Sequence, residues 1–400
     1  MLFLPLHARS WCAGLLAACA LGSVPAAEVE PAFSLQGFAT LGATRTDRAS
    51  PEFVRDLSQP RGARREWTPS VDSVAGLQAG WRFSRTLEAT VQVVSRYRHD
   101  RSHAPELAWA FLKYEPLPNL TLRAGRLGTD FFMLADSRLI GYSYLTVRPP
   151  GDFFWHLPFS SLDGADAVMG TLLGDDVLRA KVFHGRMAAQ LPLADEQWTI
   201  SGSTLAGAYV DFQRGPWQWR AGYAALRFSH DLPLQGMLSS QLPESLLGPS
   251  LAHLRTAGRW SDYYSLGLVY DRGPWQVQAM LNQIEQQSQA FESSRAASLL
   301  VGHRFGALTP YIGYSLARSS AKPDRLNPVV DRVMADSHVD QRTAMLGVRW
   351  DFARNTALKL QWDHIRADPT SLFPYRADPA TGRWSGRMNV FALTLDYIFR

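Results

Sequence analysis

Apolar and polar side chains alternate with a period of two in many segments of this chain. Residues 275–282 read WQVQAMLN and residues 390–399 read VFALTLDYIF, with aromatic or aliphatic residues at every second position. The segments 87–97 and 217–225 show the same alternation. Successive side chains of a β-strand point to opposite faces, so the pattern predicts strands with one apolar and one polar face. We therefore expect an all-β fold.

The two faces of these strands favour a barrel in a membrane over a soluble sandwich. Beyond the N-terminal segment no stretch approaches the roughly 18 consecutive apolar residues of a membrane-spanning helix, so a membrane protein of this sequence must be a β-barrel. Arginine, lysine, glutamine and aspartate occupy mid-strand positions of the polar face, which suits a wet lumen and not a dry core. Aromatic residues gather at strand ends, as at a membrane interface: Trp81 and Phe83, Trp217 and Trp219, Trp350 and Phe352, Tyr397 and Phe399.

Short and long connections alternate between the expected strands. Short turns are expected near 84–87, 115–120, 174–177, 214–217, 272–275, 306–309 and 353–356. Longer polar connections are expected at about 45–71, 98–104, 127–162, 184–203, 228–261, 287–294, 318–341 and 368–387. Seven short turns plus the paired termini on one side, against eight long connections on the other, predict about sixteen antiparallel strands. A barrel of this size encloses a water-filled lumen.

The pentapeptide Arg-Gly-Pro-Trp-Gln occurs twice, at 214–218 and 272–276. Each copy stands between two alternating segments, on the side with the short turns. Glycine and proline favour a tight bend, and the following tryptophan would begin the next strand at the interface. The repeat is interpreted as a hairpin turn, with a ligand-binding loop as the alternative.

The first 27 residues have the features of a secretory signal peptide. A basic residue precedes an apolar run, and small residues end the segment, so cleavage is expected after Ala26 or Ala27. Lipidation at Cys19 is the alternative. The only two cysteines, Cys12 and Cys19, lie in this segment. The mature domain at 28–400 therefore has neither disulfides nor cysteine metal ligands.

The chain resembles Gram-negative outer-membrane porins. The resemblance rests on FSLQGFATLG at 33–42, on LTLRAGRLGTDFFMLADSRLIGYSYLTVRPP at 120–150, and on the alternating C-terminal strand. It implies a sixteen-stranded barrel in the outer membrane, a possible homotrimer, and a third long loop folded inward as a constriction. It also implies contact with membrane lipid and lipopolysaccharide, and no cofactor. The family usually ends in an aromatic residue, whereas Arg400 follows Phe399 here.

The third long connection, about 127–162, is the expected constriction because loops of this length usually have a function. Its charged residues include Asp130, Asp136, Arg138 and Arg148. Basic residues expected on the facing wall are Arg82, Arg96, Arg123, Arg179, Lys181 and Arg220, with Arg126 at the end of the fifth strand. Charges of opposite sign across a narrow lumen would orient dipolar solutes and favour small anions. The alternatives are a loop packed on the outer rim and arginines that merely pair with neighbouring carboxylates.

The predicted function is passive diffusion of small hydrophilic solutes through an outer-membrane porin. A net charge of +5 agrees with anion preference, although basic residues at 61–67 could instead bind lipopolysaccharide phosphates. No nucleic-acid-binding module is recognisable, so we expect no nucleic acid partner. One alternative is a substrate-specific channel with the aromatic third loop as a binding ladder. The other is an outer-membrane hydrolase using His303 or His364, for which no enzymatic motif is present.

Overall fold

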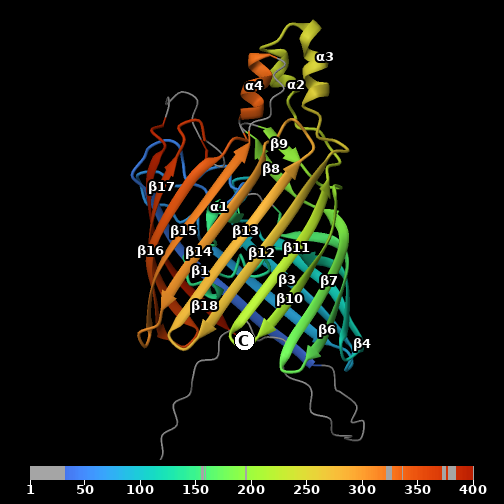
Figure 1. The fold of residues 1–400 in the computed structure, drawn as a ribbon, viewed down its shortest axis with the longest axis vertical. Coiled ribbons are helices and arrows are strands. Elements are labelled where there is room, and N and C mark those ends of the chain that lie inside the picture. Colours follow the sequence, from blue (N-terminus) through green and yellow to red (C-terminus); the bar gives the residue numbers. More distant parts are fainter. Residues whose placement is uncertain are drawn as a thin grey trace, which may run out of the picture.

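Within the residues that the computed structural model describes, sixteen strands close into one antiparallel barrel (Figure 1). The described residues are 32–154, 157, 159–193, 196–320, 327–335, 337–371, 375–376 and 384–399. The predicted signal peptide and Arg400 lie outside them. The barrel strands are β1 (Ala32–Thr46), β2 (Val74–Arg82), β3 (Leu87–Arg96), β4 (Glu106–Leu117), β5 (Leu120–Gly128), β6 (Ser161–Leu173), β7 (Asp176–Met187), β10 (Thr204–Arg214), β11 (Trp217–Arg227), β12 (Trp260–Arg272), β13 (Trp275–Gln286), β14 (Ser293–His303), β15 (Leu308–Ser320), β16 (Asp340–Ala353), β17 (Thr356–Ala367) and β18 (Arg387–Phe399).

Each barrel strand pairs with its neighbours in the chain, and β1 pairs with β18 to close the sheet. The strands β8 (Gln190–Leu193) and β9 (Glu196–Thr199) form a separate hairpin in the connection between β7 and β10. Every predicted short turn and every predicted long connection falls between two barrel strands. The prediction of an all-β, sixteen-stranded barrel is confirmed.

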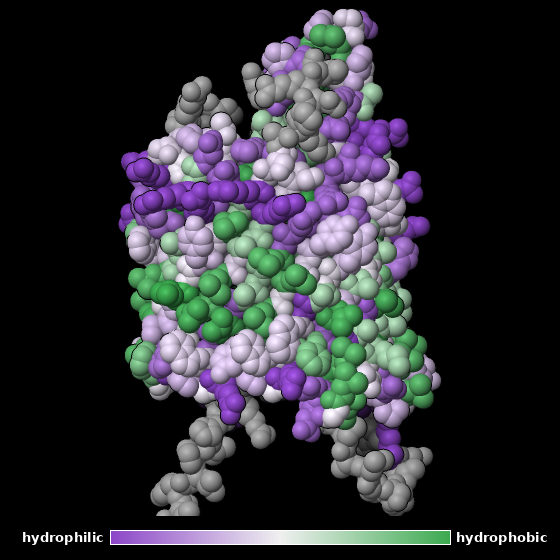
Figure 2. Space-filling model, viewed as in Figure 1, coloured by the Kyte–Doolittle hydropathy of each residue, from purple (hydrophilic) through white to green (hydrophobic). Residues whose placement is uncertain are grey.

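The barrel wall has an apolar outer face and a polar inner face. On β13 the side chain of Leu281 is 54% exposed, whereas Gln278 and Asn282 are each 6% exposed. Figure 2 shows the result on one side of the molecule, where hydrophobic surface covers the middle of the wall and hydrophilic surface borders it. This arrangement is the reverse of a soluble barrel and matches a wall that contacts lipid.

The repeated pentapeptide forms two equivalent hairpin turns. Gly215 joins β10 to β11 and Gly273 joins β12 to β13, with φ angles of 52° and 59°. Such left-handed values favour glycine because other residues strain their Cβ there. The interpretation of the repeat as a turn is confirmed.

The pairing of β4 explains an irregularity in its sequence. Residues 107–112 are apolar at both alternate sets of positions, so the sequence gives no clear lipid-facing side. The β3–β4 pairing shifts between Gln92 and Val93, which oppose Trp109 and Leu107. One extra residue on a strand reverses the face of everything beyond it. As a result Leu107 and Leu112, which have opposite parity, are both outward, at 42% and 52% exposure.

Helices stand above the rim at the end with the long connections (Figure 1). They are α2 (Gln235–Ser239) and α3 (Glu244–His253) from one connection and α4 (Pro328–Ala335) from another. A small core joins the two connections through Leu238, Leu254 and Val330, all nearly inaccessible. No helix among the described residues is long and apolar enough to cross a bilayer.

His338 fastens the connection that carries α4 to the barrel rim. Its Nδ1 lies 2.9 Å from the buried carboxylate of Glu292, and Ser319 donates a hydrogen bond to the same oxygen. The bond to Glu292 raises the pKa of His338 above its ordinary value, with Asp368 and Asp340 adding to the effect.

We expect this attachment to weaken as the pH rises. A raised pKa means that the stabilisation is fully present below about pH 6.5 and is lost as the pH rises through the raised value. Hydrogen exchange of residues 327–339, corrected for its intrinsic pH dependence, should therefore show protection that declines above this pH. The variant His338→Gln should show weak protection that does not depend on pH. If protection in that variant still declines with pH as in the native protein, the assignment is refuted.

Candidate functional site

The third long connection, between β5 and β6, follows the inward-facing side chains of the wall. The hydroxyl of Ser265 on β12 donates to the carbonyl of Phe131 at 3.2 Å, and the amide of Asn282 on β13 donates to the carbonyl of Phe153 at 3.0 Å. The backbone of Val147 donates to the side chain of Gln361 on β17 at 2.9 Å. The connection includes the short helices η1 (Gly141–Ser143) and α1 (Gly151–Phe154). It thus binds to the inner wall on strands far from its own.

A cluster of charges surrounds the start of this connection. The ammonium of Lys181 on β7 binds both carboxylate oxygens of Asp130 at 2.7 Å and lies 2.9 Å from Asp166 on β6. Arg123 on β5 forms two bonds to Asp166, at 2.9 and 2.6 Å, and lies 4.0 Å from Asp130. The hydroxyl of Tyr209 donates to Asp130 at 3.1 Å. Two cations therefore share two carboxylates.

Arg220 on β11 completes this cluster from the neighbouring strands. It forms two bonds to Asp211 on β10, at 2.6 and 2.7 Å, and donates to the carbonyl of Asp130 at 2.6 Å. Burial by itself would raise the pKa of Asp130, but Lys181 and Arg220 hold it below its ordinary value. The cluster of Arg123, Lys181, Arg220, Asp130, Asp166 and Asp211, hereafter the wall cluster, contains three cations and three carboxylates. Its formal charges cancel.

Two arginines of the third connection are buried. Arg148 is 3% exposed and binds Asp72 at 2.6 and 2.8 Å and Asp363 on β17 at 3.0 Å. Arg138 donates to the carbonyls of Leu157, at 2.7 Å, and Phe159. Burial lowers the pKa of Arg138 to about 10. Both guanidinium groups contact protein groups and not solvent.

The acidic residues of the connection differ in their surroundings. Asp136 is exposed and accepts a hydrogen bond from the backbone of Ser137 at 2.8 Å. Asp152 is buried and accepts hydrogen bonds from Ser315 on β15 and Gln341 on β16. Asp136 is therefore open to solvent, whereas Asp152 attaches helix α1 to the wall.

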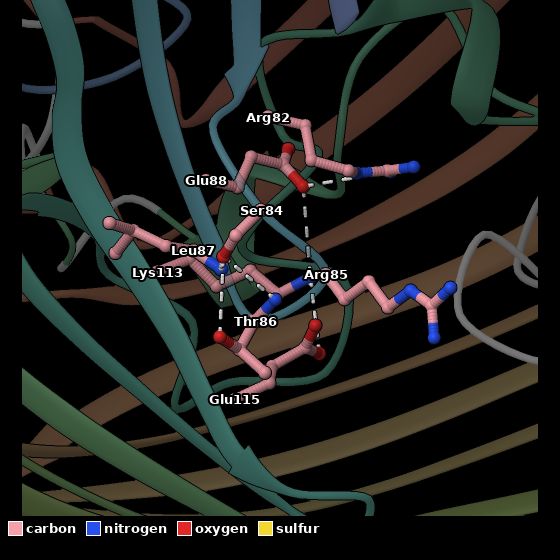
Figure 3. A pocket seen from close by; sticks show the side chains of 8 residues that line it. All are labelled: Arg82, Ser84, Arg85, Thr86, Leu87, Glu88, Lys113 and Glu115. Carbon is pink, nitrogen blue, oxygen red and sulfur yellow. Dashed lines mark hydrogen bonds and ion pairs between the residues drawn. The ribbon is translucent and has the colours of Figure 1, made fainter. Parts of the chain in front are cut away.

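The remaining predicted wall residues lie away from the wall cluster. Arg82 is 3.8 Å from Glu88 at the rim with the short turns, beside Lys113 and Glu115 (Figure 3). Arg96 lies at the opposite end of β3, 3.1 Å from Glu106. Arg179 is half-buried on the same face of β7 as Lys181, and it forms no ion pair within the described part of the chain. The structure brings Arg123, Lys181, Arg220 and Asp130 together in the wall cluster. It gathers Arg96, Arg138 and Arg148 in a second group, which Arg55, Asp56 and Asp72 connect.

The placement of Arg126 on the lumen wall is wrong. Side chains three positions apart on a strand point to opposite faces, and Arg123 is inward. Arg126 is on the outer face with the exposed Leu122, and it pairs with its register partner Asp163 at 2.6 and 2.7 Å. Arg126 was predicted to face the lumen because it is close in sequence to the third connection, but its position on the strand places it on the other face.

The carboxylates Asp166 and Asp211 were missed by sequence reasoning. Each is the direct register partner of a predicted cation: Asp166 opposes Arg123 and Asp211 opposes Arg220. A mid-strand aspartate on the polar face is visible in the sequence, but its partner is known only once the strand register is fixed.

The aromatic residues of the third connection are packed together and not displayed to solvent. Phe131, Phe132, Phe153 and Phe154 are each at most 5% exposed and belong to one apolar cluster. Phe132 meets Phe153 with ring centroids 5.2 Å apart. These rings stabilise the docked connection, so they do not offer the exposed faces that a binding ladder needs.

Within the described residues, the two histidines considered for hydrolysis have no serine partner. His303 packs against the rings of Trp275 and Phe305, with centroids 4.6 and 4.3 Å away. His364 contacts Asn389 at 2.9 Å and accepts a hydrogen bond from Arg366 at 3.0 Å. In the part of the chain that is described, neither imidazole bonds to a hydroxyl, so the geometry gives a hydrolase no support.

A closed sixteen-stranded barrel with an apolar exterior and charged inner wall is the architecture of outer-membrane channels. Comparison with solved structures agrees: the chain has the fold of Gram-negative outer-membrane porins. It superposes on the anion-selective porin from Comamonas acidovorans with a TM-score of 0.55 at 14% identity, over 92% of this chain and 100% of that one. The corresponding values are 0.58, 12%, 92% and 97% for Salmonella typhi OmpF in complex with daunomycin. They are 0.53, 14%, 92% and 100% for the trimer form of OmpT from Vibrio cholerae.

Comparison at the level of sequence gives no counterpart. No family model matches the chain, and no curated protein matches it. The similarity to porins is therefore a similarity of fold.

Proposed function

We propose that this protein is a passive diffusion channel for small hydrophilic solutes in the outer membrane of a Gram-negative bacterium. The observation that carries the proposal is the closed barrel whose outer face is apolar while its inner face holds the wall cluster. Charged side chains on the inner wall accord with water inside the barrel. The fold shared with porins supports the same function.

The third connection is the proposed constriction. Its contacts with β12, β13 and β17 put backbone and side chains against the inner wall at several points around the barrel. The wall cluster is electrically balanced, so we expect it to orient solutes more than to select their charge. The half-buried Arg179, two positions from Lys181, is the proposed source of a modest anion preference.

A homotrimer in contact with outer-membrane lipid is the proposed assembly. Support comes from the trimer form of OmpT and from the apolar outer wall. The segment 61–67 is a weaker lipopolysaccharide site than its sequence indicates, because Arg61 and Arg64 are already paired with the buried Glu52.

Single-channel recording in planar bilayers tests the proposal, and the chain provides a matched pair of variants. Arg123→Ala removes a cation of the wall cluster, whereas Arg126→Ala removes one three positions away on the outer face. We expect stable conductance steps for the native protein and a shift of reversal potential toward cation preference for Arg123→Ala only. The potential is measured under a salt gradient.

The outcomes separate the alternatives. Equal effects of the two variants would mean that a charge of the wall cluster acts on permeating ions no more strongly than a charge on the outer face. Saturable flux that one solute blocks would favour a substrate-specific channel, whereas flux that falls smoothly with solute size favours a general pore. Absence of conductance from folded protein would reject the channel.

A further inference from the structure

The inner wall is covered in the half of the barrel toward the long connections. On each of the sixteen barrel strands, at least one inward side chain in this half is at most 6% exposed. Examples from four quarters of the barrel are Thr44 on β1, Leu162 on β6, Tyr263 on β12 and Gln341 on β16. Protein atoms therefore cover this part of the wall on every side.

The opposite half of the lumen is open. Near the rim with the short turns, the inward side chains of Gln36 on β1 and Gln213 on β10 are exposed. Arg82 and Lys113 line a recess of about 210 Å³ at the same rim (Figure 3). The lumen thus has the form of a cup, which opens at the short turns and is filled toward the long connections.

Three glycines of the inner wall make room for the third connection. They are Gly222 on β11, Gly267 on β12 and Gly302 on β14, hereafter the glycine seat. A side-chain carbon at these positions would overlap the carbonyl of Phe131 and the side chains of Met133 and Leu145, respectively. Glycine weakens a strand interior and often marks a place where another segment approaches closely. The wall is therefore shaped to receive residues 131–145.

The first and third connections are also bound to each other. Arg55, between β1 and β2, donates to the carbonyl of Arg138 at 2.7 Å and lies 3.7 Å from Asp72. Asp72 in turn binds Arg148 at 2.6 Å. Residues 53–72 and 129–154, hereafter the plug, are thus attached to one another as well as to the wall.

We propose that the plug is a gate: the pore is closed at rest and opens when residues 131–148 leave the glycine seat. A constriction narrows a lumen but leaves water along its whole length, whereas close-packed protein excludes water and ions. A minor open state of a two-state protein is typically populated at about 0.1–10%. The native channel should therefore open rarely, in steps of constant size. The gate rests on the proposed function, because it regulates the same pore.

The accessibility of single introduced thiols tests the closed state directly. The chain has no cysteine after Cys19, so one new thiol reports on its own position. Ser298, an inward residue of β14, is 5% exposed, and its hydroxyl has no hydrogen-bond partner among the described residues. In detergent, Ser298→Cys should react with a trimethylammonium methanethiosulfonate roughly 10- to 1,000-fold more slowly than Gln213→Cys, in proportion to the open population. Intact mass measured over time gives both rates.

Substitution in the glycine seat should open the gate. Gly267→Val and, separately, Gly222→Val fill space that the third connection occupies, while valine suits a strand. Either should accelerate the reaction of Ser298→Cys roughly tenfold, the effect of overpacking one tight contact, and should raise the open probability in planar bilayers. The matched control is Gly170→Val, also inward, where the added carbon would lie 3.6 Å from Arg179. It should change neither quantity.

Two results would overturn the gate. One is equal reactivity of Ser298→Cys and Gln213→Cys in otherwise native protein, a comparison that decides the matter even if the valine variants do not fold. The other is folded Gly267→Val and Gly222→Val protein that reacts and conducts like Gly170→Val. Conductance separates the gate from the channel. Slow reaction of Ser298→Cys that the valine variants accelerate, with no current from any variant, would reject only the channel, whereas a native pore that stays open would reject only the gate.

Discussion

Replacing Arg148 with methionine should release part of the third connection from the wall and give larger, noisier conductance steps. Arg148 is buried between Asp72 and Asp363, and its removal leaves Asp363 without its cation and Asp72 with the more distant Arg55, 3.7 Å away. Breaking a buried ion pair by deleting one partner costs about 3–5 kcal/mol. Gln361, Lys359 and Arg349 still hold residues 141–147 to the wall, so we expect the loop to loosen locally around position 148 and not to detach as a whole.

The control for this variant restores the charge balance. In Arg148→Met/Asp363→Asn the remaining Asp72 keeps its ion pair with Arg55, 3.7 Å away, so each charge of the network has a partner, and replacing a buried ion pair by uncharged groups is often tolerated. We expect this variant to recover most of the native conductance, measured as mean step size and open-channel noise. If the single variant matches the native channel, the ion network does not hold the connection.

Substitutions of two ion-paired residues of the wall cluster should shift ion selectivity in opposite directions. The residues are Lys181 and Asp130, whose ammonium and carboxylate are 2.7 Å apart. Lys181 is 1% exposed and binds Asp130 directly. Lys181→Met leaves the cluster with one excess negative charge and should increase cation preference. Asp130→Asn leaves one excess positive charge and should increase anion preference. Each effect is read as a change in reversal potential under a tenfold salt gradient.

The opposite signs distinguish an electrostatic effect from a structural one. Damage to the docking of the third connection would move both variants in the same direction and raise conductance in both. Asp163→Asn, which removes a carboxylate from the outer face, provides the control and should leave the reversal potential unchanged. A shift in that control would mean that charges outside the lumen set selectivity.

The strands and turns could be predicted from the sequence because their determinants are local. A period of two and a Gly-Pro bend are each contained within about ten residues, and both were interpreted correctly. Strand β4 is instructive because its single register shift opposite Gln92 and Val93 requires knowledge of the partner strand. No pattern within residues 106–117 contains that information.

The site was less predictable because its contacts are distant in the chain. Val147 meets Gln361 across 214 positions, and the wall cluster joins residues of β5, β6, β7, β10 and β11. Charge and strand parity predicted that Arg123, Lys181 and Arg220 face the third connection, which contains Asp130. They could not separate the buried Arg148 from the solvent-facing Asp136, since both are charged residues of one loop.

The pairing of the first strand with the last determines when this molecule can be completed. Ten register pairs join β1 to β18, from Gly37 with Phe399 to Thr46 with Val390, and Thr40 donates a hydrogen bond to Asp396 across 356 positions. The residues that close the cylinder leave the ribosome at opposite ends of synthesis. Until the C-terminal strand arrives, β1 has an open edge able to pair with any other chain. Because the two paired strands are this far apart in the chain, we expect closure of the barrel to be the last step of its assembly.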